Sequence, residues 1–505
     1  MNSLYKYYEA HPLRAVLILG FLIRLVSVIF SKGFGMHDDH FLVIEATGAW
    51  VDGTEYDQWL PGSGAVKPDG HSFFYSGLHF LFFHFLKFIG ITDPQVMMFF
   101  VRLVHAILSL GVIYFGFKIA QKLGSLKDAS FVGLLLAVIW FLPFMSVRNL
   151  IEVVCIPFLM AGVWFTMQDI KHPRINSCFY LAGLLLGIGF CIRFQSVLFI
   201  GGLGLGFLIL GRIKHAFLIG LGVLSIFILT QAPMDYYIWG YPFAQFIEYV
   251  LYNIENATTY IIGPWYNYLL LISGVLIPPI SIMLFFGWLK TWRSQLPAFL
   301  AVFVFLAFHS YFPNKQERFI LPIVPFIITF GYMGWVSWVN NKNINSGFRN
   351  FIKYSWVFFW TLNIILLPFI STMYSKRARV ESMTYLYPVK SEIRSIITED
   401  MNRDIAFRAP RFYLGSWVQN FRIGNEPGLD SLRYILNRIP TDSLPDYILF
   451  VGEINIEERV KAVEPILPNI EYVTTISPGF IDKVLYWLNP RNKNDEIYIY
   501  RILYN

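Results

Sequence analysis

The chain has few cysteines and few charged residues, and both shortages restrict its class. Three of its 505 residues are cysteines, and only 14% are charged, whereas a soluble protein has roughly 25%. The three, Cys155, Cys178 and Cys191, stand in or beside apolar segments without metal-site spacing, so we expect neither a metal centre nor a disulfide framework. Apolar residues make up 56% of the chain. Lipid must solvate that much apolar surface, so the composition predicts an integral membrane protein.

Long apolar runs predict many membrane crossings, since a span needs about 20 apolar residues. The N-terminal run lacks the cleavage site of a secretory signal and is read as a first retained span. About eleven spans are expected, near residues 13–32, 97–119, 129–146, 150–167, 178–192, 195–211, 215–232, 266–289, 295–311, 317–339 and 354–372. The stretch 71–90 is also apolar but is rich in Phe and His. We interpret it as a helix in or dipping into the membrane interface.

Basic residues predict the orientation of the spans. Lys and Arg collect on alternate loops, and this side is typically cytoplasmic. The loops on this side contain Lys118, Lys122, Lys127, Lys171, Arg174, Arg212, Lys214, Lys290, Arg293, Lys342, Arg349 and Lys353. The opposite loop, residues 233–263, has no Lys or Arg. We therefore expect a cytoplasmic N-terminus and an external C-terminal part. The net charge of +7 does not predict a nucleic-acid partner, because these loops account for it.

The chain divides into a membrane domain, residues 1–373, and an external domain, residues 374–505. Alternating or buried apolar patterns predict strands near 446–452, 471–476 and 496–502, and a helix over 455–467. This pattern is typical of a small α/β module. No catalytic motif is visible in it.

An acidic pair, Asp38 and Asp39, follows the first span on the predicted outer side. Two close carboxylates titrate as a pair, and such a group can take a proton from a hydroxyl. Glu45 stands seven residues after Asp38, on the same face if the segment is an α-helix. A solvated loop end or a helix cap is the alternative interpretation, because Asp suits both.

Cationic and acidic residues also mark the outer ends of later spans. Arg148 and Glu152 are four residues apart and could pair along a helix or belong to a site, and Arg193 ends another span. Lys315 and Arg318 crowd one outer turn, where two cations suit a phosphate. Pairing with neighbouring carboxylates or with lipid headgroups is the alternative.

The outer loop that begins with Asp235 is rich in aromatic residues, including Trp265 and Tyr268. Aromatic side chains at this depth usually form an interfacial belt, although they can also stack on sugar rings. The residue pattern leaves both interpretations open.

Taken together, these segments resemble the GT-C glycosyltransferases, and most closely the mannosyltransferases of glycosyltransferase family 22. The resemblance covers about residues 13–372. His37-Asp38-Asp39 with Glu45 keeps the spacing of the family's Pro-Asp-Glu motif, although His replaces Pro and Asp replaces the first Glu. Asn314–Phe319 keeps Lys, Arg and Phe of a His-Lys-Glu-x-Arg-Phe motif but loses its His and one Glu. Further matches are Asp235, Trp239, Gly240, Tyr252, Asn253, Pro264, Trp265 and Tyr268.

The resemblance implies transfer of mannose or another hexose, with inversion, from a polyprenyl-phosphate donor to a glycan or lipid-linked acceptor. Asp38 would be the base, Asp39 would orient or share its proton, and Lys315 and Arg318 would stabilise the leaving phosphate. Glu45, Arg148, Glu152, Arg193, Asp235, Trp265 and Tyr268 would bind substrate. No cofactor is expected beyond the lipid-phosphate sugar itself, and no pattern indicates a divalent metal.

Two other classes fit the same topology. The chain could be a transporter or flippase for lipid or polysaccharide, but we find no internal repeat of the kind that transporters show. It could also be a receptor-like scaffold that displays the C-terminal domain. For the enzyme, a bacterial inner membrane with the site facing the periplasm is expected, with the endoplasmic reticulum and a luminal site as the alternative.

Overall fold

The structure is a computed structural model, and it describes residues 8–55, 58–68, 70–169, 173–343, 345–403, 406–467, 469–489 and 494–504. The chain forms two compact units. The bundle unit comprises Met1–Phe30, Gln58–Leu78 and Val101–Thr372. The sheet unit comprises Ser31–Asp57, His79–Phe100 and Met373–Asn505. It therefore contains two segments from the first hundred residues as well as the C-terminal part.

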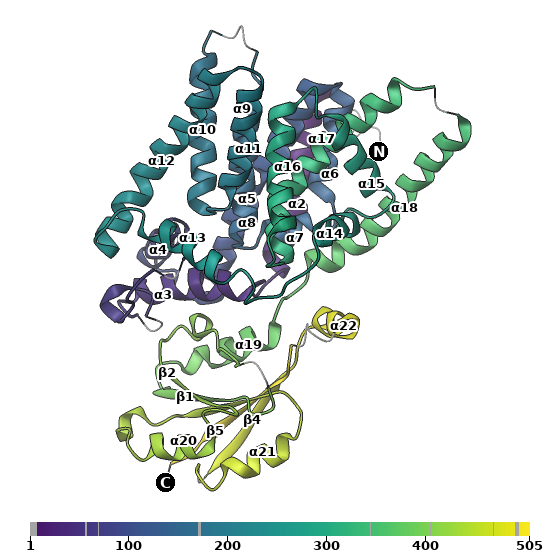
Figure 1. Cartoon of the computed structure of the whole chain (residues 1–505). Coiled ribbons are helices and arrows are strands. Elements are labelled where there is room, and N and C mark those ends of the chain that lie inside the picture. Colours follow the sequence, from purple (N-terminus) through teal and green to yellow (C-terminus); the bar gives the residue numbers. More distant parts are fainter. Residues whose placement is uncertain are drawn as a thin grey trace. The chain divides into compact units, whose positions relative to one another are not determined.

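The bundle unit is built from helices (Figure 1). They are α2 (Pro12–Phe30), the first part of α4 (Phe73–Phe88), most of α5 (Pro94–Leu123), α6 (Leu126–Val138), α7 (Leu142–Ser146), α8 (Ile151–Val154), α9 (Ile156–Thr166), α10 (Ile175–Ile192), α11 (Ser196–Ile209), α12 (Ile213–Trp239), α13 (Ala244–Glu255), α14 (Asn267–Val275), α15 (Ile280–Lys290), α16 (Leu296–Tyr311), η3 (Glu317–Ile323), α17 (Val324–Asn340) and α18 (Ser346–Ser371).

The apolar runs of the sequence coincide with these helices or with consecutive pairs of them. Among the described residues, six helices are long and apolar enough to cross a membrane, or seven if the bent pair α14–α15 is one span. Three further apolar helices are shorter. A polytopic helical membrane protein is thus confirmed, whereas the number of about eleven complete crossings stays a prediction.

Proline interrupts one of the expected spans. Residues 266–289 are one apolar run in the sequence, but α14 and α15 meet there at an angle of 118°. Pro278 and Pro279 stand in the break between them. Since proline has no backbone N–H to donate, the helical hydrogen-bond ladder cannot continue through this pair.

Glycine allows close helix contacts in the bundle. A Cβ atom on Gly183 of α10 would lie 2.3 Å from the carbonyl oxygen of Ile219 in α12. A Cβ atom on Gly222 would lie 2.5 Å from the carbonyl oxygen of Tyr180. No larger residue fits at either position without moving the backbone, so small residues bring α10 and α12 together as they do in other membrane helices.

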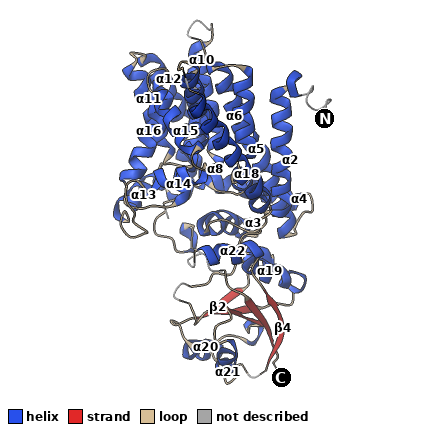
Figure 2. Ribbon diagram, turned by 90° about the vertical axis from the view of Figure 1, so that its right-hand side faces the viewer, coloured by secondary structure: helices blue, strands red, loops and turns tan. Residues whose placement is uncertain are grey.

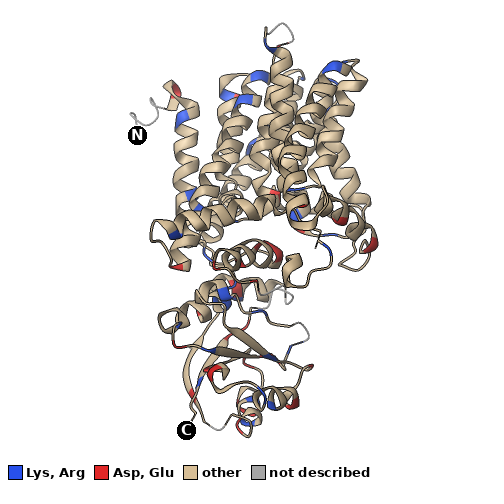
Figure 3. Ribbon diagram, turned by 90° about the vertical axis from the view of Figure 1, so that its left-hand side faces the viewer, with Lys and Arg blue, Asp and Glu red and all other residues tan. Residues whose placement is uncertain are grey.

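Basic residues gather at one end of the bundle helices. Lys122 lies in the last turn of α5, Arg212 directly precedes α12, and Lys290 ends α15. In Figure 3, blue segments mark the upper ends of these helices, and red segments gather near the lower ends. The charge asymmetry expected from the loops is therefore present in the fold. Lys171, which belongs to one of these loops in the sequence, lies outside the described residues.

The sheet unit contains a five-stranded sheet, coloured red in Figure 2, with strand order β2-β1-β3-β5-β4. β1 is parallel to β2 and β3, whereas β5 is antiparallel to β3 and β4. The elements are η1 (Asp39–Glu45), α3 (Ala46–Val51), the rest of α4, α19 (Arg377–Leu386), β1 (Ser395–Glu399), η5 (Arg411–Leu414), β2 (Gln419–Ile423), α20 (Leu429–Leu436), β3 (Tyr447–Val451), α21 (Ile456–Val463), β4 (Ile470–Ile476), α22 (Phe480–Leu488) and β5 (Ile497–Ile502).

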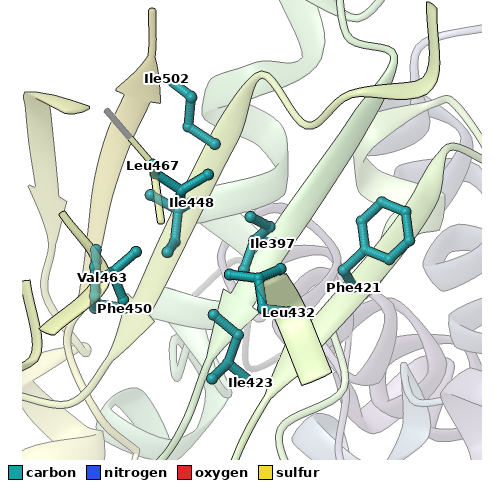
Figure 4. Close-up of a cluster of buried hydrophobic side chains, with 9 residues drawn as sticks. All are labelled: Ile397, Phe421, Ile423, Leu432, Ile448, Phe450, Val463, Leu467 and Ile502. Carbon is teal, nitrogen blue, oxygen red and sulfur yellow. The ribbon is translucent and has the colours of Figure 1, made fainter. Parts of the chain in front are cut away.

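A cluster of aliphatic and aromatic side chains forms the core beneath this sheet (Figure 4). Its members are Ile397, Phe421, Ile423, Leu432, Ile448, Phe450, Val463, Leu467 and Ile502. They come from the strands β1, β2, β3 and β5, from α20 and from the region of α21, so the core joins four of the five strands to two helices. The three strands expected from alternation are β3, β4 and β5, and the expected helix is α21.

Candidate active site

The acidic pair opens a short π-helix in the sheet unit. Asp38 is the residue before η1, and Asp39 is in its first turn. The Asp38 side chain is 45% exposed and lies 3.8 Å from Nδ1 of His37, whereas Asp39 is only 5% exposed. The two carboxylates of the pair therefore differ, since one faces solvent and the other is buried.

The π-helix changes which residues face one another. Its backbone bonds run from residue i to i+5, so residues five apart become neighbours. His40 and Glu45 are such a pair, with Nε2 of His40 3.1 Å from Oε2 of Glu45. The expectation that Asp38 and Glu45 share a face is wrong, because it assumed an α-helix.

Glu45 anchors the first loop to the C-terminal part of the sheet unit. It is fully buried. Its Oε1 accepts a hydrogen bond from the backbone N–H of Arg411 at 2.9 Å, and its Oε2 accepts one from Phe412 at 3.3 Å. These N–H groups begin η5 and lack partners within that helix. The carboxylate is therefore occupied by the protein, and the geometry favours a structural role over substrate binding.

Aromatic rings hold the same segment from both sides. The His40 ring stacks on Phe34 at 4.3 Å between centroids and on Tyr413 at 5.4 Å. Burial lowers the pKa of His40, against the opposing influence of Glu45. His40 is thus a packed, neutral ring that positions the acidic pair next to it.

Two cations that the sequence interpretation missed lie beside this segment. Nζ of Lys376 is 4.5 Å from the ring centroid of Phe34, and the guanidinium of Arg408 is 4.8 Å from that of Phe41. Burial and, to a smaller extent, the charge of Arg379 lower the pKa of Lys376 to about 7, although Asp39 and Asp38 act in the opposite direction. The signal was available, because the run Lys376-Arg377-Ala-Arg379 breaks the shortage of basic residues on the outer side.

In the bundle unit, one buried carboxylate joins two arginines. Glu152 is the second residue of α8, Arg193 follows the last residue of α10, and Arg318 lies in η3. Oε1 of Glu152 forms an ion pair with Nη1 of Arg193 and lies 3.5 Å from Nε of Arg318. All three residues are at least nine-tenths buried. We call this group the Glu152 cluster.

The Glu152 cluster contains buried polar atoms that have capacity to spare. Two guanidinium groups face its carboxylate. Among the residues that the structure describes, neither Oε2 of Glu152 nor Nε of Arg193 has a hydrogen-bond partner, although both atoms are buried. Buried polar atoms are normally paired, so a polar ligand or water is needed here.

Arg148 does not pair with Glu152 along a helix. Residues 147–150 are not helical, so α8 begins only at Ile151 and the four-residue spacing no longer aligns the two side chains. The buried guanidinium of Arg148 lies 4.4 Å from the ring centroid of Phe144.

Lys315 closes the end of α16. Its ammonium group has three N–H donors. They point to the carbonyl oxygens of His309 at 2.6 Å, of Ser310 at 2.8 Å and of Phe312. Carbonyls at a helix C-terminus attract a cation, and these contacts use all three donors. The geometry therefore separates Lys315 from Arg318, which the sequence analysis had grouped together.

Asp235 and Tyr268 also hold protein segments together. Asp235, fully buried near the end of α12, accepts from the side chain of Gln231 at 3.0 Å and from the backbone N–H of Gln245 at 3.2 Å. Gln245 is in the first turn of α13, where a carboxylate is favourable. The hydroxyl of Tyr268 bonds the backbone of Gln316.

Trp265, by contrast, is 64% exposed and packs edge-on against Tyr266. Its ring is accessible for stacking, whereas that of Tyr268 is buried. In the part of the chain that is described, no group of three or more His, Cys, Asp or Glu residues is arranged to hold a metal ion. That no metal is needed stays a prediction.

Solved structures show which fold the two units build. ArnT from Cupriavidus metallidurans bound to undecaprenyl phosphate is similar with a TM-score of 0.63 at 11% identity, over 96% of this chain and 97% of that chain. The Archaeoglobus fulgidus oligosaccharyltransferase in the apo form is similar with a TM-score of 0.52 at 9% identity, over 88% of this chain and 70% of that chain. AglB from the same organism, in complex with an inhibitory peptide and a dolichol-phosphate, gives 0.50 at 10% identity, over 94% and 74%. The chain therefore has the GT-C fold.

Sequence comparison gives the family. No curated protein matches the chain. A profile of the Alg9-like mannosyltransferase family matches residues 15–411. The match extends beyond residue 372, where the sequence resemblance ended, and takes in Lys376, Arg408 and Arg411. This excludes a mere transporter or scaffold: the chain is a membrane glycosyltransferase that belongs to the Alg9-like mannosyltransferase family, glycosyltransferase family 22.

Proposed function

We propose that the protein transfers mannose or another hexose, with inversion, from a polyprenyl-phosphate donor to a hydroxyl group of a glycan or lipid-linked acceptor. Family membership supports the hexose. Structures of the same fold with bound undecaprenyl phosphate and dolichol-phosphate support the lipid-phosphate donor. Within this chain, the observation that supports a phosphate-linked donor is the Glu152 cluster.

Asp38 is the proposed base. It takes the proton of the acceptor hydroxyl while that oxygen attacks the anomeric carbon. The bond between this carbon and the phosphate oxygen breaks, and the polyprenyl phosphate leaves with the bonding electrons. A base must reach its substrate, and Asp38 is exposed whereas Asp39 is buried. Asp39 and Lys376 then set the charge around Asp38.

The Glu152 cluster is the proposed binding site for the donor phosphate. It brings two guanidinium groups together, and Nε of Arg193 is buried without a hydrogen-bond partner among the described residues. Charge-assisted bonds from guanidinium groups to phosphate are strong, especially where water is excluded. Glu152 holds the two arginines in place, since it contacts both. Lys315 has no part in this step, because its donors already bind the end of α16.

The acceptor side is assigned to the exposed aromatic surface around Trp265, whose ring is open for stacking on a sugar. The proposed location follows from the basic helix ends. These face the cytoplasm, so that residues 374–505 are external, in the periplasm of a bacterial inner membrane or, alternatively, in the lumen of the endoplasmic reticulum. No cofactor beyond the donor itself is proposed.

Substitution of Asp38 tests the proposal. Asp38→Asn should lower transfer about 10²- to 10⁴-fold without loss of folding, which is the usual cost of a lost general base. Asp52→Asn is the matched control. Asp52 is another carboxylate of the same segment, but it pairs with Lys87 and accepts from the indole N–H of Trp417. Transfer near the normal rate by folded Asp38→Asn protein would rule out Asp38 as the base.

A further inference from the structure

Helix α22 of the sheet unit has an apolar face that no part of the described chain covers. Phe480, Val484, Trp487 and Leu488 are spaced at i, i+4, i+7 and i+8, which puts them on one side of a helix. Phe480 is 73% exposed and Trp487 is 80% exposed. Large exposed apolar faces on a folded domain mark a surface that binds something.

The other side of α22 is firmly attached to the domain. Asp482 is buried and accepts hydrogen bonds from the backbone N–H of Gly479 at 3.3 Å and from the side chain of Asn494 at 3.0 Å. It also accepts from the backbone N–H groups of Lys376 and Arg377, which begin α19. The apolar face is therefore held outward by a fixed contact on its opposite side.

This attachment places α22 next to the start of an apolar helix. Tyr374 precedes α19, and its hydroxyl lies 3.4 Å from Nε2 of Gln95, which also donates to Thr384 of α19 at 3.0 Å. Gln95 is the second residue of α5, which is long and apolar enough to cross a membrane. A Cβ atom on Gly479 would lie 3.5 Å from the carbonyl oxygen of Tyr374. These four residues all belong to the sheet unit.

The rest of the sheet unit agrees with this placement. Figures 1 and 2 both show α19 and α22 at one end of the sheet and α20 and α21 at the other. The residues just before α5 are also apolar and exposed, since Phe88 is 89% exposed and Ile89 follows it. Apolar surface thus gathers where α5 begins.

We propose that the apolar face of α22 lies in the headgroup region of the lipid bilayer, on the side where α5 enters it. A membrane is the occupant that this position favours, because a helix fixed beside the end of a span meets lipid before any other partner. Trp487 and Tyr486 are residue types that concentrate at membrane interfaces. The helix would dock the external domain against the bilayer, whatever sugar the enzyme transfers.

Site-directed labelling of the whole protein tests this. A polarity-sensitive fluorophore is attached to Trp487→Cys, in a background in which the three native cysteines are replaced by alanine. Tyr434→Cys is the matched control, since Tyr434 is an exposed aromatic residue on α20, at the other end of the domain. Each labelled protein is reconstituted into nanodiscs that contain brominated phospholipid, and its thermal unfolding midpoint is checked against unlabelled protein.

We expect brominated lipid to quench the label at 487 severalfold more strongly than the label at 434. Equal, weak quenching at both positions would overturn the proposal. Soluble iodide quenches fluorophores that are exposed to water. If the label at 487 is still protected from iodide in lipid-free amphipol, the face is covered by protein, and the proposal is contradicted. Protection that increases with protein concentration would assign it to a second copy of the chain.

Discussion

Charged side chains are buried in both units, but they are satisfied in different ways. In the bundle unit, Glu152 is shared between two arginines and Arg24 is bound by the hydroxyl of Ser109 and by backbone carbonyls. In the sheet unit, Glu45 is bound by two backbone N–H groups and a histidine, and the carboxylate of Asp38 stays exposed. The comparison shows how structural charges differ from reactive ones.

A buried charge whose hydrogen-bonding capacity is filled by its own chain holds the fold. A charge that is exposed, or that lies in a cluster with unpartnered buried atoms, can act on a substrate. By this criterion Arg24, Glu45 and Lys315 are structural. Asp38 and the Glu152 cluster are the parts that can do chemistry. Each prediction below tests this division at one position.

The largest effect is expected for Glu152→Ala. It removes the carboxylate that Arg193 and Arg318 share, and breaking a buried ion pair in this way costs about 3–5 kcal/mol. We expect poor expression and a strongly lowered thermal unfolding midpoint in detergent. Glu255→Ala is a control on an exposed helix end and should leave the midpoint unchanged. A normal midpoint for Glu152→Ala would mean that the cluster does not hold the helices together.

We expect substitutions of Arg318 and Lys315 to have different effects on donor kinetics. Arg318→Ala is expected to lower kcat/KM for a polyprenyl-phosphate sugar about 10- to 150-fold, which corresponds to about 1.5–3 kcal/mol for a lost charge-assisted contact. Arg318→Lys should recover only part of the lost kcat/KM, since the point charge of an ammonium group cannot replace a planar guanidinium group. Lys315→Met should lower stability and leave the donor kinetics of the folded fraction unchanged. The reverse pattern would assign binding of the donor phosphate to Lys315.

Glu45 should matter for stability more than for binding. Glu45→Gln places an amide group where a carboxylate accepts from two backbone N–H groups, and an unsatisfied buried group costs about 1–3 kcal/mol. We expect a lower unfolding midpoint with an unchanged acceptor Michaelis constant in the folded protein. A raised acceptor Michaelis constant at normal stability would make Glu45 a substrate-binding residue after all.

Lys376 should give the smallest effect, a pH dependence of stability. Its folded pKa is about 7, below the value of about 10.4 for an unfolded lysine. Between these values the unfolded chain binds more protons, so the free energy of unfolding from this residue rises with pH and the gain is lost as pH falls through 7. Chemical denaturation at pH 7 and pH 9 should show this rise, and Lys376→Met should remove it. An equal rise in the free energy of unfolding in the unsubstituted protein and in Lys376→Met would contradict the lowered pKa of Lys376.

Much of the fold could be predicted from the sequence, because lipid solvation and strand alternation leave plain patterns. The apolar runs became helices, and the segments around Tyr447, Glu471 and Ile497 became strands. The break at Pro278 does not follow from hydropathy, because the apolar run continues across both helices that meet there. The π-helix at Asp39 was not predictable, because its hydrogen-bond register depends on how Glu45 meets Arg411, which is far away in the sequence.

The candidate site was predictable in its residue types and not in its partners. Arg318 and Lys315 look alike in the sequence, and only the fold shows that one meets Glu152 while the other meets the carbonyls of α16. Lys376 and Arg408 were missed because the C-terminal part was treated as separate from the first loop. In the structure both belong to one compact unit.

The most direct test of the central claim follows both products of one reaction. Purified protein in lipid nanodiscs is given a polyprenyl-phosphate hexose of known anomeric configuration together with a glycan acceptor. The account predicts release of one polyprenyl phosphate for each hexose transferred, with the opposite anomeric configuration in the product by nuclear magnetic resonance. Retention of configuration, or transfer from a nucleotide sugar in place of the lipid donor, would contradict it.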